Sequence, residues 1–460
     1  MSKRSQVVFV CQECGYESPK WIGQCICGKW NTMVEEKAAS GNSDSRRRTG
    51  AETAKAVKIL DVRSGNQDRL DTGIPELNRV LGGGLVKGSL TLISGEPGIG
   101  KSTIIIQTAA KLAERYGKVL YVTGEESEEQ IKIRADRVCV TQPGELYLLA
   151  ETNIEAIFEV EALLKPSFLV IDSIQTMYSG EITSAPGSVS QVRVCTNELM
   201  RVGKTKGIPV FIVAHVTKSG DLAGPKIIEH LVDCVLNFTG ERDQEFRILR
   251  AYKNRFGTTS EIGAFEMKEE GLVGLENLSG NFLEGMDHET EGSMATAVYE
   301  GTRPLMMEVQ ALTAATNIGF ARRAAIGVDS GRLNMIIAVL DRKAGVSLIN
   351  QDVYVNIVGG LKPEGTSTDL AVALAIYSAG KGVRGAEKTL AIGEIGLTGD
   401  LRTIQNAERI IREAARLGFK KVILPGKNAD KIAEVPPGIK LAGVRNVREA
   451  ITEQFGRQDR

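Results

Sequence analysis

The chain has 460 residues, which is too long for one hydrophobic core and predicts two or three domains. With 25% charged residues, and 57 basic side chains balancing 57 acidic ones, its net charge does not mark a nucleic-acid-binding protein, so any anionic partner must be held by local basic patches. No apolar run is long enough to span a membrane and the N-terminus lacks a signal-peptide core, so we expect a cytoplasmic protein with no membrane partner.

Four of the seven cysteines lie close together in the sequence CQECGYESPKWIGQCIC. Two cysteine pairs in so short a segment predict a tetrahedral Zn²⁺ site, because a small domain of this kind folds only around a metal. The expected ligands are Cys11, Cys14, Cys25 and Cys27, in a zinc-binding domain of residues 1–37. The second pair has the spacing C-x-C instead of C-x-x-C, which leaves open whether both of its thiols bind metal. A reactive dithiol is the alternative.

Residues 38–56 are small, polar and locally basic, which is typical of a linker. Strand-like and helix-like runs then alternate through a second predicted domain, 57–285. Such alternation predicts an α/β fold with a mainly parallel sheet and helices on both faces. Strands are expected at 89–94, 118–123, 146–150, 168–172, 208–213, 234–239 and 245–252, and helices at 102–116, 125–138 and 153–165.

The sequence GEPGIGKST matches the phosphate-binding pattern G-x-x-x-x-G-K-[ST] between an expected strand and an expected helix. Its glycines let backbone N–H groups face phosphate oxygens, Lys101 reaches the β and γ phosphates, and the Ser102 hydroxyl binds Mg²⁺. ATP and Mg²⁺ are therefore expected cofactors. The residues expected at the nucleotide are Gly95, Glu96, Pro97, Gly98, Ile99, Gly100, Lys101, Ser102 and Thr103.

Carboxylates follow two of the predicted strands. Asp172 ends the apolar run FLVID, where a second group that organises Mg²⁺ is needed. Glu125 and Glu126 follow the strand before it, in YVTGEES. A carboxylate at that point polarises the attacking water, and we favour Glu126 over Glu125 for this role.

Further candidates lie beyond residue 208. His215 ends a strand and is either a sensor of the γ-phosphate or an ordinary surface histidine. Lys218 and Lys226 follow in a glycine-rich loop and are candidates for contact with a DNA backbone. Lys253 and Arg255, in KNRFG, lie two apart on an extended segment. They project on the same side, where they can act on the γ-phosphate of a neighbouring subunit.

The combination of the four-cysteine N-terminus, GEPGIGKST, YVTGEES, FLVIDSIQT and KNRFG resembles the bacterial RadA (Sms) family of DNA repair ATPases, within the RecA superfamily. The likeness extends over essentially the whole chain. It implies a RecA-like core in a hexameric ring with ATP sites between subunits. It also implies single-stranded DNA in the channel and branch migration that extends recombination intermediates. We expect the zinc domain to dock a RecA-type recombinase or the DNA fork.

In the RadA family the last part of the chain, here 286–460, is similar to the α+β proteolytic domain of Lon. Lon-type proteolysis needs a serine activated by a lysine. Ser367 lies at the candidate nucleophile position, but Glu408 stands where the lysine should be, so we expect no peptidase activity and a helix-start role for Ser367. Arg322 and Arg323 are candidates for lining a DNA channel, with a solvated basic surface as the alternative.

These patterns together predict a DNA-dependent ATPase that acts as a helicase-type translocase, of either polarity, in recombinational repair. Two alternatives come from other classes. A Lon-like ATP-dependent protease is disfavoured by the missing lysine. A KaiC-like ATPase that binds only protein partners shares the paired glutamates, but it gives no reason for a zinc domain.

Overall fold

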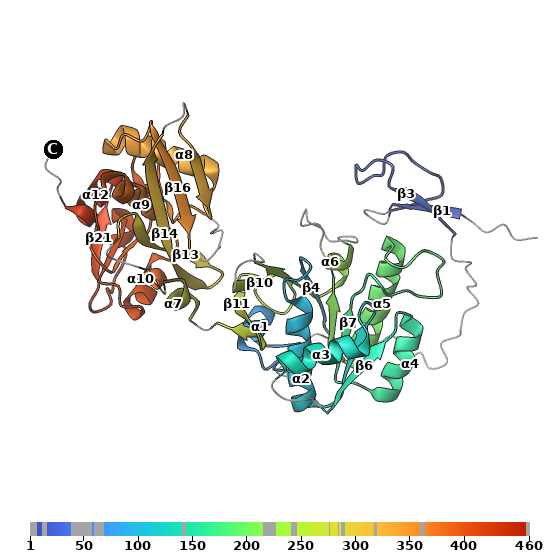
Figure 1. Cartoon of the computed structure of the whole chain (residues 1–460). Helices are drawn as coiled ribbons and strands as arrows, with labels where there is room; N and C mark the ends of the chain where they lie inside the picture. Colours follow the sequence, from blue (N-terminus) through green and yellow to red (C-terminus); the bar gives the residue numbers. More distant parts are fainter. Residues whose placement is uncertain are drawn as a thin grey trace, which may run out of the picture. The chain divides into compact units, whose positions relative to one another are not determined.

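A computed structural model gives the fold of the chain (Figure 1). It describes residues 7–11, 16–37, 58, 69–139, 144–214, 227–240, 246–275, 277–283, 285–286, 290–316, 320–358, 363 and 365–456. The chain divides into two compact units, Met1–Leu275 and Glu276–Arg460. Within the described residues, every helix is too short or too polar to cross a membrane.

A small antiparallel sheet of order β2-β1-β3 forms the N-terminal segment. Its strands are β1 (Val7–Cys11), β2 (Glu17–Ser18) and β3 (Met33–Lys37). The buried core of this segment consists of Cys11, Cys25 and Met33, with Phe9 and Ile22 packed against it. So few apolar side chains are a weak core, as expected of a segment that needs a metal.

The first unit contains a nine-stranded sheet of order β12-β11-β10-β9-β4-β8-β7-β5-β6. The six strands from β9 to β6 are parallel, and β10, β11 and β12 extend the sheet as antiparallel strands. The predicted mainly parallel sheet is confirmed. The strands are β4 (Leu90–Gly95), β5 (Val119–Thr123), β6 (Leu146–Ala150), β7 (Phe168–Asp172), β8 (Val210–Val213), β9 (Cys234–Thr239), β10 (Phe246–Asn254), β11 (Ile262–Lys268) and β12 (Gly271–Gly274).

Helices cover both faces of this sheet, because successive strand residues point to opposite sides. Ile93 and Tyr121 belong to a core cluster with α1, α2 and α3. Leu92 and Leu120 belong to a second cluster with α4, α5 and α6. The helices are α1 (Pro75–Leu81), α2 (Lys101–Tyr116), α3 (Glu128–Val138), α4 (Ile154–Leu164), α5 (Val189–Lys206) and α6 (Ile227–Leu231).

The second unit contains a seven-stranded mixed sheet of order β15-β16-β14-β13-β17-β20-β21, and a separate pair of short strands, β18 and β19. Strand β14 is antiparallel to both of its neighbours, β13 and β16, whereas β17, β20 and β21 continue the sheet from β13 in parallel. The strands are β13 (Ser293–Glu300), β14 (Arg303–Ala315), β15 (Arg323–Ile326), β16 (Gln351–Ile357), β17 (Thr389–Ala391), β18 (Glu394–Ile395), β19 (Leu401–Arg402), β20 (Lys421–Pro425) and β21 (Lys440–Val444).

The helices of the second unit include one, α9, whose residues 369–378 are all buried against β13 and β14. Helix α10 forms a core cluster with one face of β13 and β14. The helices are α7 (Leu278–Leu283), α8 (Ser330–Val339) with a π-turn η2 (Leu340–Ala344), α9 (Asp369–Lys381), α10 (Ala407–Arg416), α11 (Gly426–Ala429) and α12 (Val447–Phe455).

The division between the two units lies before the boundary predicted at 285/286. Helix α7 belongs to the second unit because it packs on β14. The backbone N–H of Met306 donates a hydrogen bond to the Ser279 hydroxyl at 3.1 Å, and Leu278 and Phe282 are buried. These contacts tie α7 to the sheet that follows it in the chain.

Candidate nucleotide and metal sites

The phosphate-binding loop joins β4 to α2, as its pattern predicts. Gly95, Gly98 and Gly100 all have positive φ angles, which glycine adopts without strain. A Cβ at Gly95 would come within 2.8 Å of the Phe238 carbonyl oxygen, and one at Gly100 within 2.9 Å of the Met267 methyl group. Glycine is therefore required at Gly95 by backbone conformation and by space, and at Gly100 mainly by backbone conformation, because the methyl end of Met267 can move aside.

Lys101 begins α2 and its side chain folds back over the loop. Its ammonium donates hydrogen bonds to the carbonyl oxygens of Gly95 and Glu96, at 2.8 and 2.9 Å. Burial lowers the pKa of Lys101 to about 8, against the opposing attraction of Asp172, Glu125 and Glu96. The site thus holds a cation that is mostly charged at neutral pH and loses its proton in the mildly alkaline range, surrounded by carboxylates.

Asp172 ends β7, at the same edge of the sheet as the phosphate-binding loop. Its Oδ2 atom accepts a hydrogen bond from the Tyr121 hydroxyl at 2.6 Å, and its carboxylate also accepts one from the Ser102 side chain. Burial raises the pKa of Asp172. The hydrogen bonds from Tyr121 and Ser102 oppose that rise, and the charges of Glu125 and Glu126 add to it. Ser102 and Asp172 are oxygen donors in contact, which fits a Mg²⁺ ion.

Glu125 and Glu126 follow β5, and each already has a partner. The Ser173 hydroxyl donates to Glu125, and Arg134 of α3 forms an ion pair with Glu126. The backbone of Glu126 is fixed by the Thr123 hydroxyl, which accepts from its N–H at 3.1 Å and donates to its carbonyl at 2.9 Å. Both glutamates stay at the site, so the choice of Glu126 remains a prediction.

These groups line a cavity of about 530 Å³ at the carboxyl end of β4, β5 and β7. Eight of the residues predicted to bind nucleotide or to act in catalysis line this cavity: Pro97, Gly98, Gly100, Lys101, Ser102, Thr103, Glu126 and Asp172. A volume of this size fits the nucleotide-sized range of ligand sites. The geometry suits binding of a phosphorylated ligand with Mg²⁺ and attack of water on it.

Four further residues at this site were not identified from the sequence: Tyr121, Arg134, Arg137 and Arg247. For Arg134 a signal existed, because it lies seven residues after the helix cap Ser127 and two helical turns return it to the same side of α3. A tyrosine in a buried strand also signals a partner for its hydroxyl. Arg247 arrives from β10, far along the chain, and only the fold reveals it.

Three cysteines meet in the N-terminal segment. The Sγ atoms of Cys11, Cys25 and Cys27 lie within 4.8 Å of one another, and those of Cys11 and Cys27 are 3.9 Å apart. Thiolates bound at about 2.3 Å in a tetrahedron are separated by about 3.8 Å, so the donor set fits Zn²⁺. The structure brings Cys27 to the cluster despite the C-x-C spacing. Cys14, the fourth predicted ligand, lies outside the described residues.

Three curated proteins, each named DNA repair protein RadA, are similar to the chain over nearly their full lengths. The protein of Bacillus subtilis (strain 168) is 50% identical over 452 residues, or 97% of this chain and 98% of its own. That of Halalkalibacterium halodurans is 48% identical over 99% of this chain and 100% of its own. That of Listeria monocytogenes is 48% identical over 96% and 97%. The chain belongs to the RadA family of DNA repair proteins.

Segments of this RadA-family chain also match broader families. Residues 9–35 match a rubredoxin metal binding domain, residues 53–221 an AAA domain, and residues 310–428 the ChlI subunit of Mg-chelatase. The chain is therefore an ATP-hydrolysing enzyme of the RadA family, with a zinc ribbon, a RecA-like core and a Lon-like second unit. The KaiC-like protein PH0186 from Pyrococcus horikoshii OT3 is similar at 21% identity and a TM-score of 0.37, covering 45% of this chain and 98% of its own, and carries no argument here.

The KNRFG segment of this RadA-family chain is anchored to its own subunit. The Lys253 ammonium donates hydrogen bonds to the carbonyl oxygens of Glu229, His230 and Val232, at 2.7, 3.1 and 2.8 Å, and so caps the end of α6. Arg255 pairs with the buried Asp233 at 3.0 Å while half of its side chain stays exposed. Neither residue lines the cavity within the described chain.

The DNA-contact candidates and the γ-phosphate-sensor candidate His215 fall into two groups, those within the described residues and those outside them. Arg322 and Arg323 are exposed, at the start of β15, and the Arg322 backbone N–H donates to Asp352 at 2.7 Å. His215, Lys218 and Lys226 lie outside the described residues. Their roles remain predictions.

The position of Ser367, the candidate nucleophile of the Lon-like domain, differs from the predicted helix start. Ser367 does not start a helix: α9 begins at Asp369, with Thr368 as its cap residue. The Ser367 hydroxyl instead donates to the Ala297 carbonyl of β13 at 3.3 Å, so it is used to attach the segment to the sheet. Glu408 forms an exposed ion pair with Arg412 on α10.

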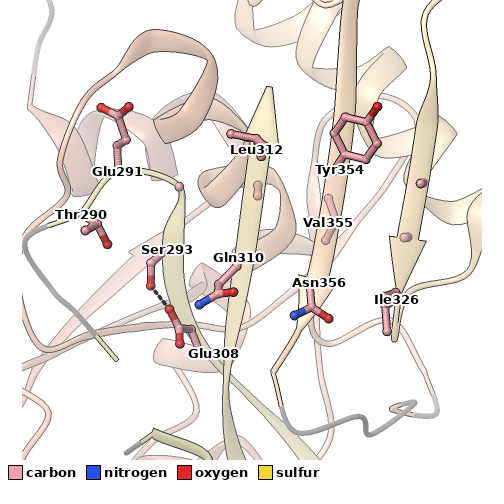
Figure 2. A pocket seen from close by; sticks show the side chains of 14 residues that line it. Thr290, Glu291, Ser293, Glu308, Gln310, Leu312, Ile326, Tyr354, Val355 and Asn356 are labelled. Carbon is pink, nitrogen blue, oxygen red and sulfur yellow. Dashed lines mark hydrogen bonds between the residues drawn. The ribbon is translucent and has the colours of Figure 1, made fainter. Parts of the chain in front are cut away.

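A second cavity, of about 440 Å³, lies on the sheet of the second unit. Figure 2 shows that side chains of neighbouring strands form its wall, among them Leu312, Ile326 and Tyr354. Two glutamates line it, Glu291 and Glu308, and Glu308 accepts a hydrogen bond from the Ser293 hydroxyl at 2.6 Å. The described residues around this cavity include none of the residues predicted for catalysis, metal or DNA.

Proposed function

We propose that this RadA-family chain is an ATP-driven motor on single-stranded DNA, which extends recombination intermediates by branch migration. The observation that carries the proposal is the convergence of Lys101, Ser102, Asp172 and Glu126 on one cavity. Lys101 binds the β and γ phosphates, Ser102 and Asp172 hold Mg²⁺, and Glu126 orients the attacking water. The bound Mg²⁺ neutralises charge that develops on the phosphates. The choice of DNA rests on the RadA relatives.

We further propose a hexamer in which the KNRFG segment acts on the ATP site of the neighbouring subunit. Because Arg255 is half exposed, its guanidinium is available to a phosphate outside its own chain. Lys253 fixes the strand end from which Arg255 projects, through its three carbonyl contacts. Arg322 and Arg323 are proposed to contact DNA, and the zinc ribbon to dock a RecA-type recombinase.

Steady-state ATP hydrolysis with and without single-stranded DNA tests the motor. We expect DNA to raise the wild-type rate, and Lys101→Ala to abolish hydrolysis under both conditions. Arg201→Ala, which removes an exposed ion pair on α5, is the matched control and should retain the wild-type response. A wild-type rate that ignores DNA would mean that the nucleotide drives assembly or protein docking, and the motor proposal would be withdrawn.

Mixing two inactive variants tests the action between subunits. A Lys101→Ala subunit keeps Arg255, and an Arg255→Ala subunit keeps its phosphate-binding loop. If Arg255 acts on the neighbour, mixed oligomers contain some complete sites and regain part of the activity. Mixtures that stay as inactive as the separate variants contradict this arrangement.

A further inference from the structure

The nucleotide cavity contains an ion pair in which each partner keeps one unused atom. Arg134 donates through Nη2 to Oε1 of Glu126, and both residues line the cavity. The other two atoms, Glu126 Oε2 and Arg134 Nη1, are shut off from solvent and have no hydrogen-bond partner among the described residues. Leaving atoms of charged groups buried and unsatisfied is costly, so the pair is better suited to serve a ligand than to stabilise the fold.

The backbones that carry the two side chains are held firmly. Glu126 is tied to the end of β5 by two hydrogen bonds with Thr123. Helix α3, which carries Arg134, begins with a capping box in which Ser127 and Gln130 bond reciprocally. The geometry of the pair therefore depends on the two side chains alone, and Arg134 fixes which Glu126 oxygen is left for other partners.

The other charged groups at the cavity explain why Glu126 needs a cation beside it. Glu125 and Asp172 place two further carboxylates at the same cavity, and without a cation beside it Glu126 would be repelled from them. Lys101 is occupied by the carbonyls of its own loop, whereas Arg134 contacts Glu126 directly. Arginine suits this task because its guanidinium is always charged and presents several donors in a rigid plane.

We propose that Arg134 is a positioning residue for ATP hydrolysis: it holds Oε1 of Glu126, and Oε2, which solvent does not reach in this structure, is the oxygen left to take the attacking water when ATP fills the cavity. This inference rests on the proposed role of Glu126. As water attacks the γ-phosphorus, the bond from phosphorus to the bridging oxygen of ADP breaks. The proton lost by the water passes to Oε2, and the products are ADP and inorganic phosphate.

A double-mutant cycle on the full chain tests the inference, measured as ATP hydrolysis without DNA. Arg134→Gln should lower kcat about 100-fold, as expected when a general base is misplaced, with ATP-analogue affinity changed less than about threefold. Arg134→Lys, which keeps the charge, should recover part of the loss. The double variant Glu126→Gln with Arg134→Gln should be no slower than Glu126→Gln alone, because Arg134 acts only through Glu126. Lys132→Gln, on the exposed face of α3, is the matched control.

Three results would overturn the inference. One is additive losses in the double variant, and another is a loss of nucleotide affinity that accounts for the whole defect of both Arg134 variants. The third is a Glu126→Gln variant that hydrolyses ATP at the wild-type rate, which removes the role of Glu126 as well. Absence of DNA stimulation in the wild type contradicts the motor proposal alone, because the cycle is measured without DNA.

Discussion

The two units of the chain treat buried charge in opposite ways. In the first unit, Lys101, Asp172 and the Glu126–Arg134 pair meet at a cavity, and atoms of the pair remain without partners among the described residues. In the second unit, Arg332 donates from Nε to both carboxylate oxygens of Asp369 at 3.1 Å, and Asp369 also accepts from the Ile395 N–H. The first arrangement leaves bonding capacity for a ligand, whereas the second uses it within the fold.

The cavities of the two units also differ in the charge of the side chains that line them. The nucleotide cavity is lined by three arginines and a lysine facing three carboxylates. The cavity of the second unit is lined mainly by uncharged side chains, with two glutamates: the exposed Glu291, and Glu308, which is already bonded to Ser293 (Figure 2). Buried charges therefore indicate chemistry only where the fold has not already satisfied them.

The largest expected effect is at Asp172. Asp172→Asn keeps the shape but removes the charge that organises Mg²⁺, so we expect ATP hydrolysis to fall by about 10³-fold. Since burial raises the pKa of Asp172, the neutral side chain should not lower the melting temperature. Hydrolysis assays and thermal unfolding measure both. A variant that unfolds instead of losing activity would make Asp172 resemble Asp369 and would remove the contrast between the units.

The reverse outcome is expected for Arg332. Arg332→Ala leaves the buried Asp369 carboxylate without its partner, which should lower the free energy of unfolding of the second unit by about 3 kcal/mol. Basal ATP hydrolysis per folded molecule should be unchanged. Glu408→Ala, which breaks the exposed pair with Arg412, is the control and should cost less than about 0.5 kcal/mol. Equal losses in the two variants would refute the structural role of the buried pair.

The pH dependence of ATP binding tests whether the buried charge of Lys101 serves a ligand. Burial lowers its pKa from 10.5 to about 8, and the ammonium is the form that attracts phosphate. ATP affinity should therefore be full below pH 8 and fall above it, by at most about tenfold per pH unit. The unfolded chain keeps this proton up to its higher pKa, so the contribution of Lys101 to stability rises with pH in the same window. Fluorescent-nucleotide titrations between pH 7 and 9.5 measure the affinity, and Lys101→Met should bind weakly at every pH.

The smallest expected effect is at Tyr121. Tyr121→Phe removes the hydrogen bond to Asp172, which should raise the pKa of Asp172 further and weaken its hold on Mg²⁺. A loss of about 1 kcal/mol corresponds to roughly fivefold slower hydrolysis at limiting Mg²⁺, recovered at high Mg²⁺. Tyr147→Phe on β6 removes an exposed hydroxyl and serves as control. A defect that excess Mg²⁺ leaves unchanged would argue against a role through Asp172.

Local patterns predicted the elements next to the phosphate-binding loop, because such a loop requires a strand before it and a helix after it, but helix α5 and strands β11 and β12 were not among the expected elements. Contacts between distant segments were not predictable in the same way. The Tyr121–Asp172 bond exists because β5 and β7 are neighbours in the sheet, and strand order cannot be derived from hydrophobic periodicity. The helix start was misplaced by one residue, at Ser367 instead of Thr368, because a serine and a threonine both suit a helix start and only the hydrogen bond from Ser367 to Ala297 distinguishes them.

The phosphate-binding loop is supported by strands made much later in translation. At Gly100 the space for a side chain is filled by Met267 and Leu272 of β11 and β12. At an elongation rate of 5–20 residues per second, these side chains are synthesised roughly 10 to 30 seconds after the loop. The nucleotide site therefore has no complete wall on a shorter nascent chain. The nucleotide site can be completed only after β12 has emerged from the ribosome. A chain truncated before Met267 would therefore carry the whole phosphate-binding motif and still lack a stable ATP site.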